Sequence, residues 1–89
     1  MRISSVLWDD DNEAHIAEHG LTIDDVESVL LNPKAKTGVS KSSDRSLRFG
    51  YTASGMYIAV AFDVLDEVDG LVYPVTAYEV QEPRSRRRS

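Results

Sequence analysis

The stretch that decides the fold is Arg45–Val80, which reads RSLRFGYTASGMYIAVAFDVLDEVDGLVYPVTAYEV. It predicts consecutive antiparallel strands, because apolar segments alternate with turn signals. Ser54 and Gly55 supply a two-residue hairpin turn between the first pair of strands, and residues 66–70 supply a longer acidic turn before the last strand. Pro74 lies inside the last strand, where it has no N–H to donate, so we expect an edge position or a bulge there.

The middle strand of this meander has one apolar face and one face of small and polar side chains. Alternate residues of a strand point to opposite faces of the sheet. The apolar face therefore needs a cover, and the other face is where we expect function. The apolar face carries Met56, Ile58, Val60, Phe62 and Val64, and the other face carries Tyr57, Ala59, Ala61 and Asp63.

The residues before the meander predict this cover. A short strand at residues 3–8 comes first. Asp10 and Glu13 then form a capping-box pattern that starts a helix, and Gly20 ends the helix just after His19.

A second helix begins at the capping-box pair Thr22 and Asp25 and stops before Pro33. Its apolar residues recur at helical spacing, so we expect this stripe to pack on the apolar face of the middle strand. The stripe is Ile23, Val26, Val29 and Leu30, and the expected partners are Ile58, Val60 and Phe62.

Two more strands are expected, an edge strand at residues 35–39 and the first meander strand at residues 45–52. On the latter, Arg48 alternates with Leu47 and Phe49. We therefore expect Arg48 to point away from the helices, toward the face that carries Tyr57.

Together these elements predict an α+β fold: a short N-terminal strand and two small helices packed on one face of a mainly antiparallel sheet. Residues 1–82 form a single domain on this interpretation. Residues 83–89 form a basic tail that we expect to be disordered.

The composition excludes several classes of protein. No cysteine is present, which leaves neither a disulfide framework nor a thiolate metal site. No apolar run approaches the ~20 residues that cross a bilayer, so we expect a cytoplasmic protein with no membrane segment. The net charge of −5 is uneven, since four of the ten basic residues follow Pro83 and five lie between Lys34 and Arg48. Such a basic strip attracts phosphate backbones, but it also simply solubilises a loop, and both interpretations stay open.

Metal and cofactor motifs are missing from the sequence. His15 and His19 have the four-residue spacing that suits zinc, but two ligands do not make a site and no third lies nearby. We expect surface or network histidines, and neither a metal nor a cofactor. There is no phosphate loop or nucleophile elbow, so any chemistry must come from arginine, histidine, tyrosine and carboxylate groups.

The order of the short motifs resembles the BrnT-type toxins of bacterial toxin–antitoxin pairs. The segment VLWDDDNEAHIAEHGLTIDDVESVLLNP has the Trp-Asp, the His-Gly at the end of the first helix and the amphipathic second helix of that family. Asp44-Arg45, followed by Gly50, is similar to an acidic-Arg pair of the family, and Val75-Thr76-Ala77 is similar to its last strand motif. The resemblance covers about residues 5–80.

The resemblance implies a compact ribonuclease fold similar to RelE toxins, metal-independent cleavage of cellular RNA, and neutralisation by a cognate antitoxin that binds DNA. Trp8 and Gly20 match structural positions of the family, and Arg45 and His19 match positions that the family retains. Two features depart from the family. Tyr78 stands where an arginine is expected, and a short arginine tail replaces an Arg-rich closing helix.

RNA cleavage without a metal needs a base, an acid and a cation that stabilises the phosphorane charge. The candidate catalytic residues are Arg45, Arg48, Tyr78, His19 and Tyr57, and the candidate RNA-binding residues are Lys34, Lys36 and Lys41. Each has a structural alternative, such as a tyrosine packing at the rim of the sheet or an arginine pairing with Asp44.

A second class of function stays open beside the ribonuclease. The missing arginine at Tyr78 and the acidic body favour a toxin-like binding module that pairs with a partner protein or binds nucleic acid without cutting it. The small core also favours a homodimer or a complex with an antitoxin.

Overall fold

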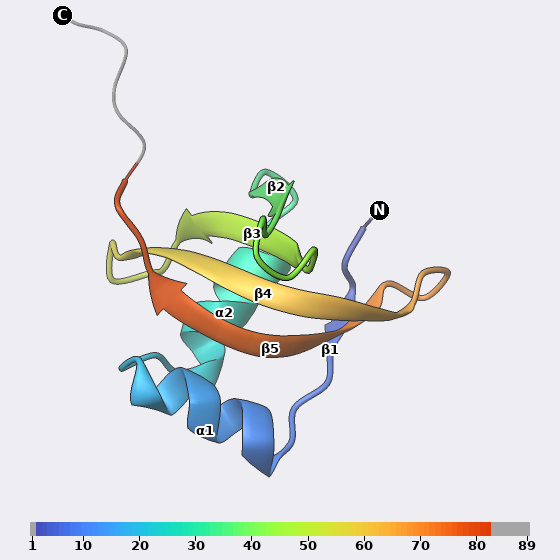
Figure 1. The fold of residues 1–89 in the computed structure, drawn as a ribbon, viewed down its shortest axis with the longest axis horizontal. Helices are drawn as coiled ribbons and strands as arrows, with labels where there is room; N and C mark the ends of the chain where they lie inside the picture. The colour runs from blue at the N-terminus through green and yellow to red at the C-terminus, as the bar shows by residue number, and fades with distance from the viewer. Residues whose placement is uncertain (1, 83–89) are drawn as a thin grey trace, which may run out of the picture.

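The computed structural model describes residues 2–82 and has an α+β architecture, which confirms the predicted class (Figure 1). The expected tail at residues 83–89 lies outside the described residues. Five strands form one sheet in the order β1-β5-β4-β3-β2, in which β1 runs parallel to β5 and the other neighbours are antiparallel. In chain order the elements are β1 (Ser5–Val6), α1 (Asp10–Glu18), α2 (Ile23–Leu30), β2 (Lys36–Val39), β3 (Ser46–Tyr51), β4 (Tyr57–Asp66) and β5 (Leu71–Glu79).

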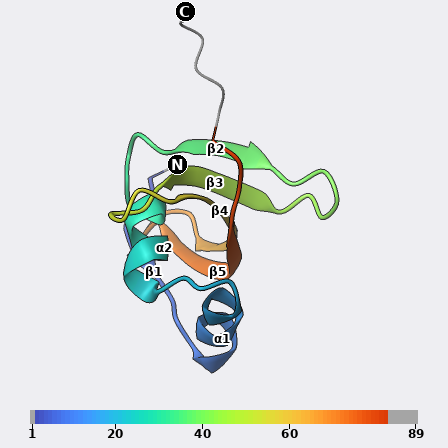
Figure 2. The ribbon, with the colours of Figure 1, turned by 90° about the vertical axis from the view of Figure 1, so that its left-hand side faces the viewer.

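The core lies between the helices and one face of the sheet. In Figure 1, α2 passes behind β3 and β4 while α1 runs along β5, and Figure 2 shows both helices from the side. The predicted packing of the α2 stripe on β4 is confirmed, because the two sets belong to one cluster. Its buried members are Ile3, Ile16, Leu21, Val26, Val29, Leu30, Ile58, Val60, Phe62, Val72 and Ala77. We call the opposite side of the sheet, which faces the viewer in Figure 1, the open face.

Both helices begin at capping boxes, one of them at the predicted residues. Thr22 and Asp25 cap α2 as expected. The α1 box uses Asp9 and Asn12 instead of Asp10 and Glu13, so that prediction was wrong by one residue. The Asn12 amide also donates to the Leu7 carbonyl at 3.0 Å, and this second bond holds the box in place.

The turn between β3 and β4 is longer than predicted. The backbone closes between Thr52 and Met56, with the Thr52 N–H donating to the Met56 carbonyl at 2.8 Å. The Thr52 hydroxyl also accepts from the Met56 N–H at 3.1 Å, and Gly55 takes a positive φ of 92°. The side chain of Thr52 thus completes a longer loop, and the prediction of a two-residue turn was wrong.

Strand β5 contains the bulge that Pro74 predicts. The register with β4 shifts between Ala61 and Phe62, whose partners are Thr76 and Pro74, so Val75 has no partner on β4. The free carbonyl of Val75 lies 3.2 Å from His15 Nδ1 on α1. The bulge therefore frees a carbonyl for a contact with α1.

The face of strand β3 that points toward the helices is the opposite of the one that the sequence predicts. Arg48 pairs with Val60, and Gly50 pairs with Ile58, so Arg48 and Gly50 face α2. A Cβ added to Gly50 would lie 3.4 Å from a methyl carbon of Val29, which shows how closely α2 approaches the strand here. Leu47 and Phe49 point to the open face instead. The prediction that Arg48 shares the open face with Tyr57 was wrong, because α2 needs a residue without a side chain beneath it.

Candidate functional site

The open face is organised in rows that cross the strands. The antiparallel registers align Lys36 of β2, Phe49 of β3, Ala59 of β4 and Tyr78 of β5 in one row. Residues in such a row lie side by side on one face, about 5 Å apart from strand to strand. Ala59, which lies between Phe49 and Tyr78 in this row, is almost fully buried.

Aromatic rings gather at one end of this face. The Phe49 and Tyr57 rings are nearly parallel, with centroids 6.4 Å apart, and the Tyr51 and Tyr57 centroids are 4.8 Å apart. A shallow hollow of about 310 Å³ lies beside them and is lined by Lys36, Phe49, Tyr57, Val80 and Gln81. A planar group that enters this hollow meets aromatic rings and one ammonium group.

Two of the predicted proton-transfer groups meet at the β5 edge of the same row. His19 follows the last turn of α1, and its ring centroid lies 6.2 Å from that of Tyr78. His19 is exposed and Tyr78 is half-buried. The structure therefore brings His19, Tyr78 and Lys36 to one row, with Tyr57 next to it.

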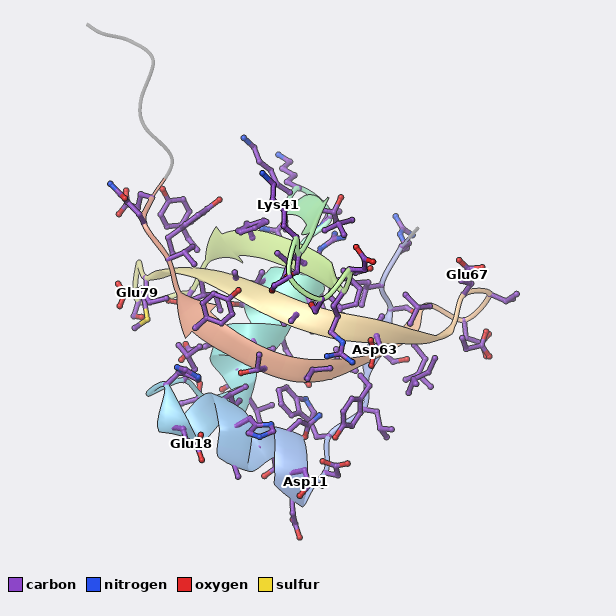
Figure 3. The ribbon with its side chains drawn as sticks, in the orientation of Figure 1. Asp11, Glu18, Lys41, Asp63, Glu67 and Glu79 are labelled. Carbon is purple, nitrogen blue, oxygen red and sulfur yellow. The ribbon has the colours of Figure 1, made fainter. Side chains whose placement is uncertain are left out.

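Arg45 lies elsewhere on the face. Its Nε donates to Asp63 Oδ1 at 2.9 Å, and both side chains are about half exposed, at 39% and 47%. Asp63, labelled in Figure 3, is four residues along β4 from Ala59. At about 3.3 Å per residue this separates the ion pair from the Tyr78 row by about 13 Å. Arg45 and Tyr78 are thus not adjacent, and Arg45 is already paired with a carboxylate.

Arg48 is on the opposite side of the sheet. Its side chain is only 7% exposed, and Nη2 donates to the Asn32 carbonyl just after α2 at 2.8 Å. Burial lowers the pKa of the Arg48 guanidinium below its ordinary value. The guanidinium nevertheless remains a cation, since arginine does not lose its proton in proteins. It does not meet Tyr57 or Tyr78.

The remaining predicted residues are exposed lysines on the β2 side. Lys34, Lys36 and Lys41 are exposed, and of these Lys36 belongs to the aromatic row. Figure 3 places Lys41 on one side of the molecule and Asp11 and Glu18 of α1 on the other. The open face thus has a basic border at β2 and an acidic border at α1.

Sequence reasoning missed Phe49 and Tyr51 as parts of the face. The sequence signal that would have found them is Gly50, because a glycine inside an apolar strand often marks a close approach of another element. If Gly50 faces a helix, Phe49 and Tyr51 must point the other way.

Within residues 2–82, no group of three or more histidine or acidic side chains is arranged to hold a metal ion. In the same range, no helix is long and apolar enough to span a bilayer.

Comparisons with known proteins identify no relative: no family model, no curated protein and no solved structure matches this chain.

Proposed function

We propose that this protein is the toxin of a toxin–antitoxin pair and that it binds and cleaves RNA on the open face of its sheet. The observation that carries the proposal is the cross-strand row of Lys36, Phe49, Ala59 and Tyr78, which ends at His19. Partly exposed aromatic rings on a sheet suit single-stranded RNA, whose bases stack on them, each stack contributing about 1–3 kcal/mol. The exposed Lys34, Lys36 and Lys41 at the β2 border supply positive charge for the phosphates.

In this proposal His19 accepts the proton of a ribose 2′-hydroxyl. The 2′ oxygen attacks phosphorus, a P–O2′ bond forms and the P–O5′ bond breaks. Tyr78 donates its proton to the departing 5′ oxygen. Lys36, three strand spacings or about 14 Å from Tyr78 along the row, binds a neighbouring phosphate of the RNA. The products are a 2′,3′-cyclic phosphate and a free 5′-hydroxyl. Tyr57 and Phe49 hold the flanking bases.

The test is growth arrest and RNA cleavage by the full chain. Expression should stop growth, and the purified protein should cut single-stranded RNA to cyclic-phosphate ends without added metal. His19→Gln and Tyr78→Phe should each slow cleavage by about 10²-fold or more, since each removes one positioned proton-transfer group. His15→Gln is the matched control, because His15 is also exposed on α1 but contacts the Val75 carbonyl instead of the row.

Equal activity of His19→Gln and the parent would contradict the assigned roles. If the parent protein neither arrests growth nor cuts RNA, the proposal that it is a ribonuclease is wrong.

A second candidate function is a binding module without catalysis. It is favoured by the state of the two arginines, since Arg45 is paired with Asp63 and Arg48 is buried on the other face. Such a module would bind single-stranded RNA on the same aromatic row and leave it intact. Binding that is lost in Tyr57→Ala, without any cleavage by the parent, would select this function.

The proposal includes an antitoxin partner and a cytoplasmic location. The acidic first turn of α1, with Asp10, Asp11 and Glu13, complements a basic antitoxin segment. A homodimer is the alternative assembly. Light scattering of the chain alone separates a dimer from a monomer, and a short neighbouring reading frame with a DNA-binding motif would supply the antitoxin.

A further inference from the structure

A groove with a buried arginine lies on the helix-bearing side of the sheet, where α2 leaves part of β3 and β4 uncovered. It consists of two hollows of about 490 and 460 Å³. Both hollows are lined by Ile3, Pro33 and Arg48, so they adjoin each other at these residues. The open face with its aromatic row is on the other side of the sheet, so this groove is separate from the proposed RNA surface.

The fold alone does not account for the charge of Arg48. One of its N–H groups bonds to the Asn32 carbonyl, but Nε is buried and has no partner among the described residues. The ion pair found within residues 2–82 joins Arg45 to Asp63 and does not involve Arg48. Buried charges in proteins are normally paired, because removing a lone charge from water is unfavourable. A neutral donor would serve the Asn32 carbonyl equally well, so the guanidinium points to an anion that binds in the groove.

The rest of the lining shows what kind of anion fits. Val39, Val64 and Leu31 border the groove with exposed fractions of 63%, 37% and 41%. The polar side chains of the first hollow, apart from Arg48, are the small hydroxyls of Thr37 and Ser46. Arg2 lines the second hollow together with Arg48. A ligand with one anionic end and an apolar body would therefore cover the apolar surface and, at the same time, pair its anionic end with the guanidinium.

We propose that this groove binds a small organic carboxylate with an apolar body, whose carboxylate pairs with Arg48. The planar guanidinium matches a carboxylate and makes strong, charge-assisted hydrogen bonds with it. Each hollow has the volume of a small-molecule site, about 300–1,000 Å³, and its lining combines apolar side chains with polar groups. An inorganic anion would leave the apolar walls uncovered.

The test compares three probes on the full chain by calorimetry and by amide shifts in NMR spectra. Octanoate, kept below its micelle-forming concentration, should bind saturably at one site and shift the amides of Ile3, Val39 and Val64. The neutral 1-octanol should bind at least about 10-fold more weakly, because it lacks the charge-assisted bond. Sodium phosphate should not compete. Equal binding of octanoate and 1-octanol, competition by phosphate, or no octanoate binding would each overturn the proposal.

Variants identify the groups that bind octanoate. Arg48→Met should weaken octanoate binding about 10-fold or more and leave 1-octanol binding unchanged. If Arg48→Met does not fold, Val39→Asp takes its place. It adds a negative charge, like that of octanoate, at an exposed position on the border of the groove and away from the core. It should also weaken octanoate binding. Val68→Asp is its control, because Val68 is 94% exposed on the β4–β5 turn, outside the groove. An unchanged octanoate affinity in Val39→Asp would contradict the site.

Discussion

Asp9 joins three parts of the chain through one carboxylate. Oδ1 accepts from the Asn12 N–H at 3.0 Å, and the Tyr73 hydroxyl of β5 donates to both carboxylate oxygens at 2.9–3.0 Å. These bonds, that of Asn12 foremost, lower the pKa of Asp9 below its ordinary value of 3.8. A carboxyl group whose pKa is lower in the folded than in the unfolded state stabilises the fold fully above the unfolded pKa. This stabilisation disappears as the pH falls through the folded pKa.

The free energy of unfolding should therefore decrease below about pH 4 in part through Asp9. Asp9→Asn keeps an oxygen that can cap α1 but has no charge to titrate. Urea unfolding from about pH 5 to about pH 2 should show a shallower acid decline in Asp9→Asn than in the parent. Parallel declines would show that Asp9 is not linked to stability. Asp69→Asn is a control on a distant acidic turn.

Single residues were also where sequence reasoning succeeded and failed most clearly. His19 and Tyr78 were candidates on chemical grounds, and the structure brings their rings together. Their contact was not predictable, because it depends on how the end of α1 meets β5 across nearly sixty residues of chain. Arg48 was placed on the wrong face because alternation fixes which residues share a face but not which face is covered.

At the scale of elements, the sequence was sufficient to locate an element where the interactions that start it are local. Thr22 and Asp25 bond to each other's backbone within one turn, so the sequence alone located the start of α2. Strand β1 was predicted over residues 3–8 but covers only Ser5–Val6. Its length depends on the pairing with Leu71 and Val72, and no local pattern reports that pairing.

The packing of α2 on β4 provides a stability prediction. Val60 is fully buried on the helix-bearing face, between Arg48 on β3 and Ala77 on β5. Val60→Ala should lower the free energy of unfolding by about 1–3 kcal/mol, because it removes two methyl groups and leaves a cavity. Urea denaturation measures this change. Val68→Ala, at a position 94% exposed, should stay within about 0.5 kcal/mol of the parent. A Val60→Ala loss as small as that of Val68→Ala would contradict the described core.

At the scale of the whole molecule, charge is separated across the sheet. Lysines border the β2 side, and Asp11 and Glu18 lie on α1 near the β5 side (Figure 3). The sequence predicted the basic segment but not its position, since only the register places Lys36 in the aromatic row.

This arrangement predicts how the proposed RNA binding responds to salt. In a titration of the full chain with single-stranded RNA, Lys36→Ala should make the slope of log K against log salt concentration shallower by about 0.7, the value for one phosphate contact on a single strand. Arg2→Ala is the control, because Arg2 lines the groove on the other side of the sheet. An equal change of slope in both variants would mean that binding follows overall charge and not the open face.

The position of β5 also governs how the chain folds during synthesis. The last strand of the sequence lies between β1 and β4, and α1 packs along it. When β4 leaves the ribosome, the β2–β4 hairpins can pair, but β1 and α1 still lack their partner. They must wait until residues 71–79 appear and then close a loop that spans most of the chain, an entropically demanding and slow step. Until that moment the nascent chain exposes the unpaired edge of β4 and the side of α1 that packs on β5, which makes it a natural client for chaperones.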